Sequence, residues 1–219
     1  MSDLFVDTVS PIAGRTLLVS GLATAIAVVL GIPCGYAIAR RRFHGRTLLL
    51  GIINTGMGMP PVVVGLFVWL LLVRSGPLGT LEMVYTRAGM IGAQVLIATP
   101  VVIGFATASF QALPARLPDL LLVSGAGAWR TMWLLAAEAK LGLLVSVMAG
   151  FGAAVSESSA SLIVGGNLEG STRVLTTAIM TETSRGEVET ALALGVVLLA
   201  MAFVINLALT IVQQRRRSG

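Results

Sequence analysis

The sequence predicts an all-α, polytopic membrane protein, and two observations carry that prediction. Only 11% of the 219 residues are charged and 56% are hydrophobic, whereas soluble domains carry about 25% charged residues. The hydrophobic residues are also gathered into runs that are long enough to cross a bilayer, which takes about 20 residues in a helix. A soluble domain is therefore excluded.

Five apolar segments meet this length requirement. They are Thr16–Ala39, Thr47–Val73, Ala88–Phe110, Leu141–Gly165 and Thr190–Val212. Only the fourth contains a charged residue, Glu157. We expect the five segments to be membrane spans of a single transmembrane domain that takes in residues 1–219.

The second segment contains residues that interrupt helices. These are Asn54, Gly56, Gly58, Pro60 and Pro61. We therefore expect a kinked or broken helix, which survives in a membrane only where neighbouring helices or water satisfy the freed backbone groups. Pro100, in the third segment, predicts a milder bend.

Basic residues alternate between the loops and predict the orientation. Ten follow the first, third and fifth segments: Arg40, Arg41, Arg42, Arg46, Arg116, Arg130, Lys140, Arg215, Arg216 and Arg217. Five lie on the other side: Arg15, Arg74, Arg87, Arg173 and Arg185. The positive-inside rule predicts an external N-terminus and a cytoplasmic C-terminus. Because these charges flank apolar runs, membrane orientation explains the pI of about 10.6, and we expect no nucleic-acid partner.

The single cysteine and the single histidine limit the possible chemistry. Cys34 lies inside the first apolar segment and has no partner for an internal disulfide, while His44 lies in a basic turn. Together they exclude a Cys/His metal cluster within one chain. We expect no metal and no cofactor.

Glu157 is the only charge between Leu141 and Leu168, and hydroxyl-bearing or small residues surround it. A carboxylate in hydrocarbon costs a few kcal/mol, so it rarely faces lipid. Two interpretations stay open: Glu157 lines or gates a transport path, or it is structural and bonds to backbone or to serines of a neighbouring helix. A bare carboxylate is a poor ligand for an anion, so direct substrate binding is not expected.

The cytoplasmic loop over residues 111–140 predicts a short helix. Pro118 suits the first position of a helix, and Asp119 follows in the first turn, where a negative charge is favourable. Leu117, Leu120 and Leu121 then form an apolar face that ends at the glycines after Ser124. Trp129 and Trp133, four residues apart, share a helix face. This helix either docks in a groove of a soluble partner or packs on its own bundle.

The external loop predicts a second short helix, at about 171–184. Val174, Leu175, Ala178 and Ile179 recur at helical spacing between threonines. Such an amphipathic helix can anchor at the membrane surface or cover a pathway.

Several motifs, in order, resemble those of tungstate-type ABC importer permeases from about Leu17 onward. The motifs lie at residues 53–66, 74–79, 150–157, 164–167, 172–173, 176–179, 182–186 and 191–195. The resemblance implies the type I importer permease fold. It also implies a permease homodimer, two cytoplasmic ABC ATPase subunits and an extracytoplasmic oxyanion-binding protein.

The family's coupling motif, Glu-Ala-Ala followed by Gly, maps onto the cytoplasmic loop. Asp119 and Gly125 match its Glu and Gly, while Leu120 and Leu121 replace the alanines and Ala137-Glu138 replaces Leu-Pro. Ala153 likewise stands where relatives have arginine, and Ser158-Ser159 replaces Val-Gly. The resemblance thus implies that ATPase coupling involves Leu117, Asp119, Leu120, Leu121, Gly125 and Ala126.

The sequence therefore predicts an oxyanion permease of a prokaryotic cytoplasmic membrane, in contact with lipid, with tungstate as first substrate and molybdate as second. We expect the path or gate to include Asn54, Met57, Pro60, Pro61, Gly150, Gly152, Ser156, Glu157, Ser158, Asn167 and Thr177. ATP hydrolysis would lie on the partner, so the chain has no catalytic residues. The alternative is an ion-coupled secondary transporter or channel with Glu157 as a proton site. An intramembrane serine enzyme is disfavoured because no Ser-His or Ser-Lys pair lies within the spans.

Overall fold

The computed structural model describes residues 2–41, 43–114, 116–123, 125 and 127–215, and it is helical, with no strand in this part of the chain. The helices are α1 (Ser2–Arg40), α2 (Arg46–Met57), α3 (Pro61–Leu72), α4 (Arg87–Gln111), α5 (Leu117–Val123), α6 (Ala128–Glu138), α7 (Lys140–Val155), α8 (Ser159–Gly165), α9 (Leu175–Ser184) and α10 (Val188–Arg215). A 3₁₀ turn, η1 (Gly79–Leu81), lies between α3 and α4. The predicted all-α class is confirmed.

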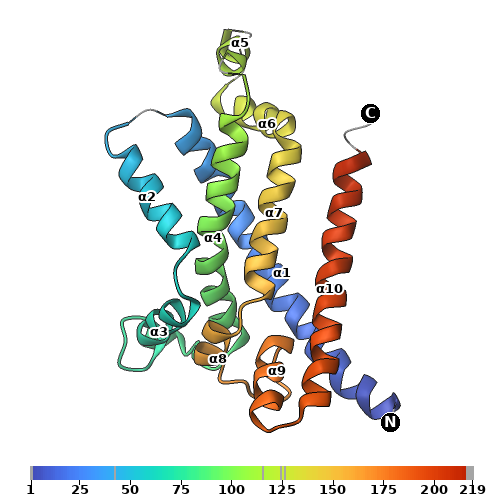
Figure 1. Ribbon diagram of the computed structural model, residues 1–219. Coiled ribbons are helices and arrows are strands. Elements are labelled where there is room, and N and C mark those ends of the chain that lie inside the picture. The colour runs from blue at the N-terminus through green and yellow to red at the C-terminus, as the bar shows by residue number, and fades with distance from the viewer. Residues whose placement is uncertain (1, 42, 115, 124, 126, 216–219) are drawn as a thin grey trace.

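The bundle has two distinct ends (Figure 1). Helices α5 and α6, the α1–α2 loop and the C-terminal end of α10 lie at one end, which we call the α5 end. The N-terminus, α3, α8 and α9 lie at the other, the α9 end. The loops that carry most of the basic residues therefore share the α5 end.

Helices α1, α4 and α7 form the centre of the bundle. Ala27, Ala98, Val102 and Ala154 are buried together where the three helices meet. Two glycines of α1 permit the close approach, because a Cβ on Gly31 would lie 2.7 Å from Val102 Cγ1 and one on Gly35 would lie 2.8 Å from Ala106 Cβ. Gly31 and Gly35, four residues apart, thus serve helix packing within the chain.

Three helices are long and apolar enough to span a membrane, namely α1 from Val9, α4 and α10, in the part of the chain that is described. The number rises to five if two bent pairs each count as one span. Helices α2 and α3 meet at 101°, and α6 and α7 meet at 81°. The apolar segment 141–165 is divided, because α7 ends at Val155 and α8 begins at Ser159.

The break expected in the second segment is confirmed. Helix α2 ends at Met57, and Pro61 is the first residue of α3, where its missing N–H costs nothing. The end of α2 packs on α4: a Cβ on Gly56 would lie 3.0 Å from Pro100 Cβ, and the Met57 sulfur lies close to Gly104. Pro100 itself lies inside α4, which remains one continuous helix.

Candidate transport and coupling sites

Glu157 lies in the three-residue gap between α7 and α8 and caps the second helix. Its side chain is buried, with 4% exposed. Oε1 accepts the Ala160 backbone N–H at 2.8 Å, and Oε2 accepts the Ser161 N–H at 2.9 Å. The first N–H groups of a helix have no partner within the helix and favour a negative charge nearby. Both carboxylate oxygens therefore stabilise the start of α8.

The gap and α8 are each joined to another helix. The Thr176 hydroxyl of α9 donates to the Glu157 carbonyl oxygen at 3.0 Å. On α8, Ser161 Oγ accepts the Gln94 Nε2 of α4 at 3.1 Å. The bonding of Glu157 to backbone agrees with its structural interpretation, and its carboxylate partners are backbone N–H groups rather than serine hydroxyls. The sequence did not indicate the helix break, because no Pro interrupts residues 141–165.

Close packing holds α8 against α3. A Cβ on Gly65 would lie 2.5 Å from Ala160 Cα. Val64 and Val68 of α3 are buried together with Val164 of α8. The two short helices that follow the two breaks therefore pack on each other at the α9 end.

The residues expected to line a path fall into three groups by their exposure in one chain. Asn54, Met57, Pro60, Pro61 and Ser156 are exposed; Gly152, Ser158 and Asn167 are half-buried; Gly150, Glu157 and Thr177 are buried. Gly150 faces α4, because a Cβ there would lie 2.6 Å from Val102 Cγ2. The structure therefore does not bring all eleven residues to one surface of the chain.

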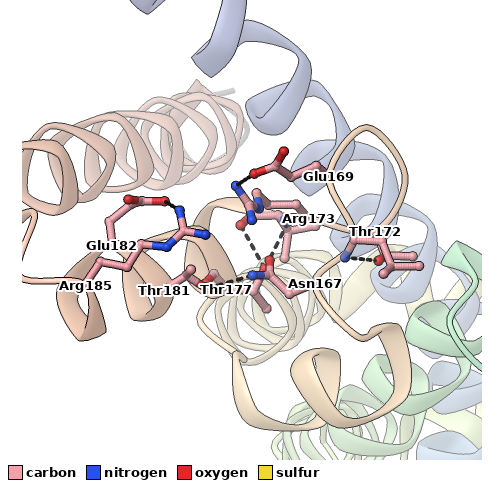
Figure 2. Close-up of polar contacts among 10 residues, drawn as sticks. Asn167, Glu169, Thr172, Arg173, Thr177, Thr181, Glu182 and Arg185 are labelled. Atoms are coloured by element: carbon pink, nitrogen blue, oxygen red, sulfur yellow. Dashed lines mark hydrogen bonds and ion pairs between the residues drawn. The ribbon is translucent and has the colours of Figure 1, made fainter.

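The loop before α9 is held by polar contacts (Figure 2). Asn167 has a φ of 50° and donates from Nδ2 to Thr181 Oγ1 at 2.7 Å. Thr172 Oγ1 accepts the Leu168 N–H and donates to the Gly165 carbonyl at 2.6 Å. Arg173 pairs with Glu169 at 2.6 Å. The side chain of Asn167 thus ties the loop to α9.

The second short helix, predicted at about 171–184, forms as α9 and is buried on one face. Leu175 and Ala178 pack with Val9 and Ile12 of α1 and Leu194 of α10. Val174 precedes α9 as its N-cap residue. The apolar residues at helical spacing therefore contact α1 and α10 of the same chain.

Helix α5 forms within the loop predicted to be cytoplasmic and has two different faces. Leu117 and Leu121 pack against the buried cluster of Phe110 and Leu135. Leu120 and Val123 point outward, with 62% and 89% exposed. The packing on the bundle is therefore observed for one face, whereas docking on a soluble partner stays a prediction for the exposed face.

The other residues singled out in this loop lie in or after α5 and in α6. Asp119 lies in α5, Gly125 follows it with a φ of 80°, and Ala126 lies outside the described residues. Trp129 and Trp133 share a face of α6, and their rings meet edge to face at 5.9 Å. The sequence analysis did not single out Val123, although its place three residues after Leu120 puts it on the same helix face.

Comparison with known proteins identifies the family. Residues 27–218 match the family model described as "Binding-protein-dependent transport system inner membrane component". The chain belongs to this family. It is 39% identical to the "Probable anion ABC transporter permease protein" of Haloferax volcanii, over 94% of this chain and 91% of that protein. It is 36% identical to the "Tungstate uptake system permease protein TupB" of Peptoclostridium acidaminophilum, over 91% and 87%.

The fold comparison agrees with this permease family. The methionine ABC transporter MetNI, in an inward-facing conformation, contains a chain that superimposes with a TM-score of 0.77 at 16% identity, covering 98% of this chain and 99% of that one. The family match and the two permease relatives show that the chain is a membrane transport subunit, as its sequence predicted. The ion-coupled transporter is not favoured.

Proposed function

We propose that this permease moves an oxyanion across a prokaryotic cytoplasmic membrane, with tungstate as the first substrate and molybdate as the second. The observation that carries the proposal is the similarity, over nearly the whole chain, to a permease named for tungstate. A still more similar relative is named for an anion. Molybdate ranks next because it has the same tetrahedral shape and double negative charge.

The proposed assembly is a homodimer of permeases with two ABC ATPases at the α5 end and an oxyanion-binding protein at the α9 end. The N-terminus would lie outside and the C-terminus in the cytoplasm, because the α5 end carries most of the basic residues. The anion would pass between the two protomers, near the α2–α3 break and the polar residues around α8. Exposed apolar residues such as Leu199 and Phe203 of α10 would face lipid or the second protomer.

The exposed face of α5 is the proposed contact with the ATPase. Leu120 and Val123 present apolar side chains to the cytoplasm, while Leu117 and Leu121 fix the helix to α4 and α6. A short helix held on one side and exposed on the other can enter a groove of a soluble partner. Closure of the ATPases would then move α5, and its packing would pass the movement to α4.

The test is ATP-driven uptake of radiolabelled tungstate into proteoliposomes that contain the permease, its ATPase and its binding protein. Val123→Asp should lower uptake at least tenfold and prevent co-purification of the ATPase, because a charge in an apolar contact is costly. Gln111→Glu is the matched control: it places a carboxylate on an exposed residue of the same end, outside α5, and should transport normally.

Two results would overturn the proposal. Normal uptake by the Val123→Asp transporter would exclude the docking face. Tungstate or molybdate uptake by the permease alone, without the ATPase, would instead favour an ion-coupled transporter.

A further inference from the structure

Three arginines from three segments converge at the α9 end. Arg15 lies in α1, Arg87 begins α4, and Arg173 lies in the loop before α9. We call them the arginine triad. The positive charges of Arg87 and Arg173 both act on Arg15.

Packing beneath the triad fixes this convergence. Val19, Met90 and Val174 form one buried cluster. Each lies close in sequence to one arginine: four residues after Arg15, three after Arg87 and one after Arg173. Since residues three or four apart share a helix face, the arginines of α1 and α4 lie above the same apolar contact.

Two hydrogen bonds draw the segments together at the same level. The Leu175 N–H donates to the Thr16 hydroxyl at 2.9 Å, which joins the start of α9 to the residue after Arg15. Arg87 Nε donates to the Ser171 carbonyl at 2.9 Å, two residues before Arg173. The loop therefore lies between α1 and α4.

The positive charge of the triad is only partly compensated. Arg173 pairs with Glu169, whereas no ion pair joins Arg15 or Arg87 to a carboxylate in the described part of the chain. Three guanidinium groups and one carboxylate leave a net charge of +2. A doubly charged anion would neutralise it.

The triad also has buried donors without acceptors. Arg15 Nη1 and Arg173 Nε are closed to solvent and have no hydrogen-bond partner. An unsatisfied buried donor costs about 1–3 kcal/mol, and more for a charged group. Arg15 Nε donates to the Pro11 carbonyl, so its terminal nitrogens remain for a ligand.

We propose that Arg15, Arg87 and Arg173 bind a tetrahedral oxyanion at the α9 end. Guanidinium groups match the oxygens of such anions in both charge and geometry. If the proposed function holds, the ligand is the transported dianion, received from the binding protein at this end. The phosphate of an anionic lipid headgroup has the same chemistry and is the other source.

The first experiment measures equilibrium binding of radiolabelled tungstate to the full-length permease in nanodiscs of zwitterionic lipid. Arg15→Gln should weaken binding about tenfold, the effect of losing a charged hydrogen-bond donor. Arg15→Lys should bind with intermediate affinity. Arg185→Gln is the control, because Arg185 is an exposed arginine of the same end that pairs with Glu182.

A gain of binding excludes misfolding as the explanation. Glu169 is exposed and neutralises part of the triad. Glu169→Gln should therefore tighten tungstate binding about two- to fivefold, the range of an exposed ion pair. A variant that fails to fold cannot produce this result.

The second experiment identifies the source of the anion. Native mass spectrometry counts phosphatidylglycerol molecules retained by the wild type and by Arg15→Gln. The site is assigned to the headgroup by two results together. The wild type retains a lipid that Arg15→Gln loses, and the wild type loses tungstate binding in phosphatidylglycerol nanodiscs. Tungstate binding that persists in those nanodiscs assigns it to the free dianion.

Equal tungstate affinity and equal lipid retention in the wild type, Arg15→Gln and Glu169→Gln would overturn the inference. The uptake assay separates this failure from failure of the proposed function. If the wild type takes up tungstate, and Arg15→Gln has an unchanged KM together with unchanged lipid retention, the triad is rejected and the proposed function stands. Absence of ATP-driven uptake of tungstate and of molybdate in the wild type rejects the proposed function, whatever the triad binds.

Discussion

The two helix breaks have the same length but different origins. Residues 58–60 separate α2 from α3, and residues 156–158 separate α7 from α8. The first break is exposed and contains Pro60, with no side-chain cap on α3. The second contains the buried Glu157, whose carboxylate bonds to two N–H groups of α8. Local backbone chemistry makes the first break, and a tertiary polar contact maintains the second.

This difference matters because both breaks position the same contact. Helices α3 and α8 pack on each other through Gly65 and Ala160 at the α9 end. The first break needs only its own sequence, whereas the second depends on Glu157, Thr176 and the neighbouring helices. Substitutions at the second break should therefore cost much more stability.

The largest effect is expected at Glu157. Glu157→Ala leaves the Ala160 and Ser161 N–H groups buried without acceptors and should lower the free energy of unfolding by about 3 kcal/mol. Glu157→Gln keeps an amide oxygen for one N–H and should lose about half as much. Chemical unfolding in detergent micelles measures both, with the exposed Glu138→Ala as a control expected within about 0.5 kcal/mol of the wild type. A loss below 1 kcal/mol in Glu157→Ala would remove the contrast between the breaks.

The first break was predictable from sequence because local backbone restrictions determine it. The second was not predictable because it depends on a tertiary contact. Gly58, Pro60 and Pro61 restrict the backbone wherever they occur, so the interruption of the second segment follows from local sequence. Glu157 is a residue that tolerates a helix interior, and only its burial beside α9 makes it a cap. The sequence showed that its charge needed a partner but not that the partners were backbone groups of α8.

The arginine triad illustrates the same limit. Arg15, Arg87 and Arg173 are far apart in sequence, and the loop pattern indicated only that they share one side of the membrane. Their convergence depends on the packing of Val19, Met90 and Val174, which come from different segments. By contrast, α5 and the Trp129–Trp133 pair rest on short-range spacing, and both were predicted.

An intermediate effect is expected at the contact between α3 and α8. Gly65→Ala places a Cβ 2.5 Å from Ala160 Cα and should cost about 1–3 kcal/mol through overpacking. Gly51→Ala is the matched control, because nothing lies within 4 Å of its Cβ position in α2. Alanine is favoured over glycine in a helix, so the control should be neutral or stabilising by up to about 1 kcal/mol. Equal stability of the two variants would show that α3 and α8 do not pack this closely.

The smallest effect is expected at Pro60, in the locally determined break. The Val63 N–H donates to the Pro60 carbonyl at 2.9 Å, and any residue supplies that carbonyl. Pro61 still excludes the helical conformation from the preceding residue, so Pro60→Ala should keep the break. The cost should stay below about 1 kcal/mol, mainly from a more flexible unfolded chain. Unfolding in the same micelles measures this cost, and a loss as large as that of Glu157→Ala would show that the first break also depends on tertiary contacts.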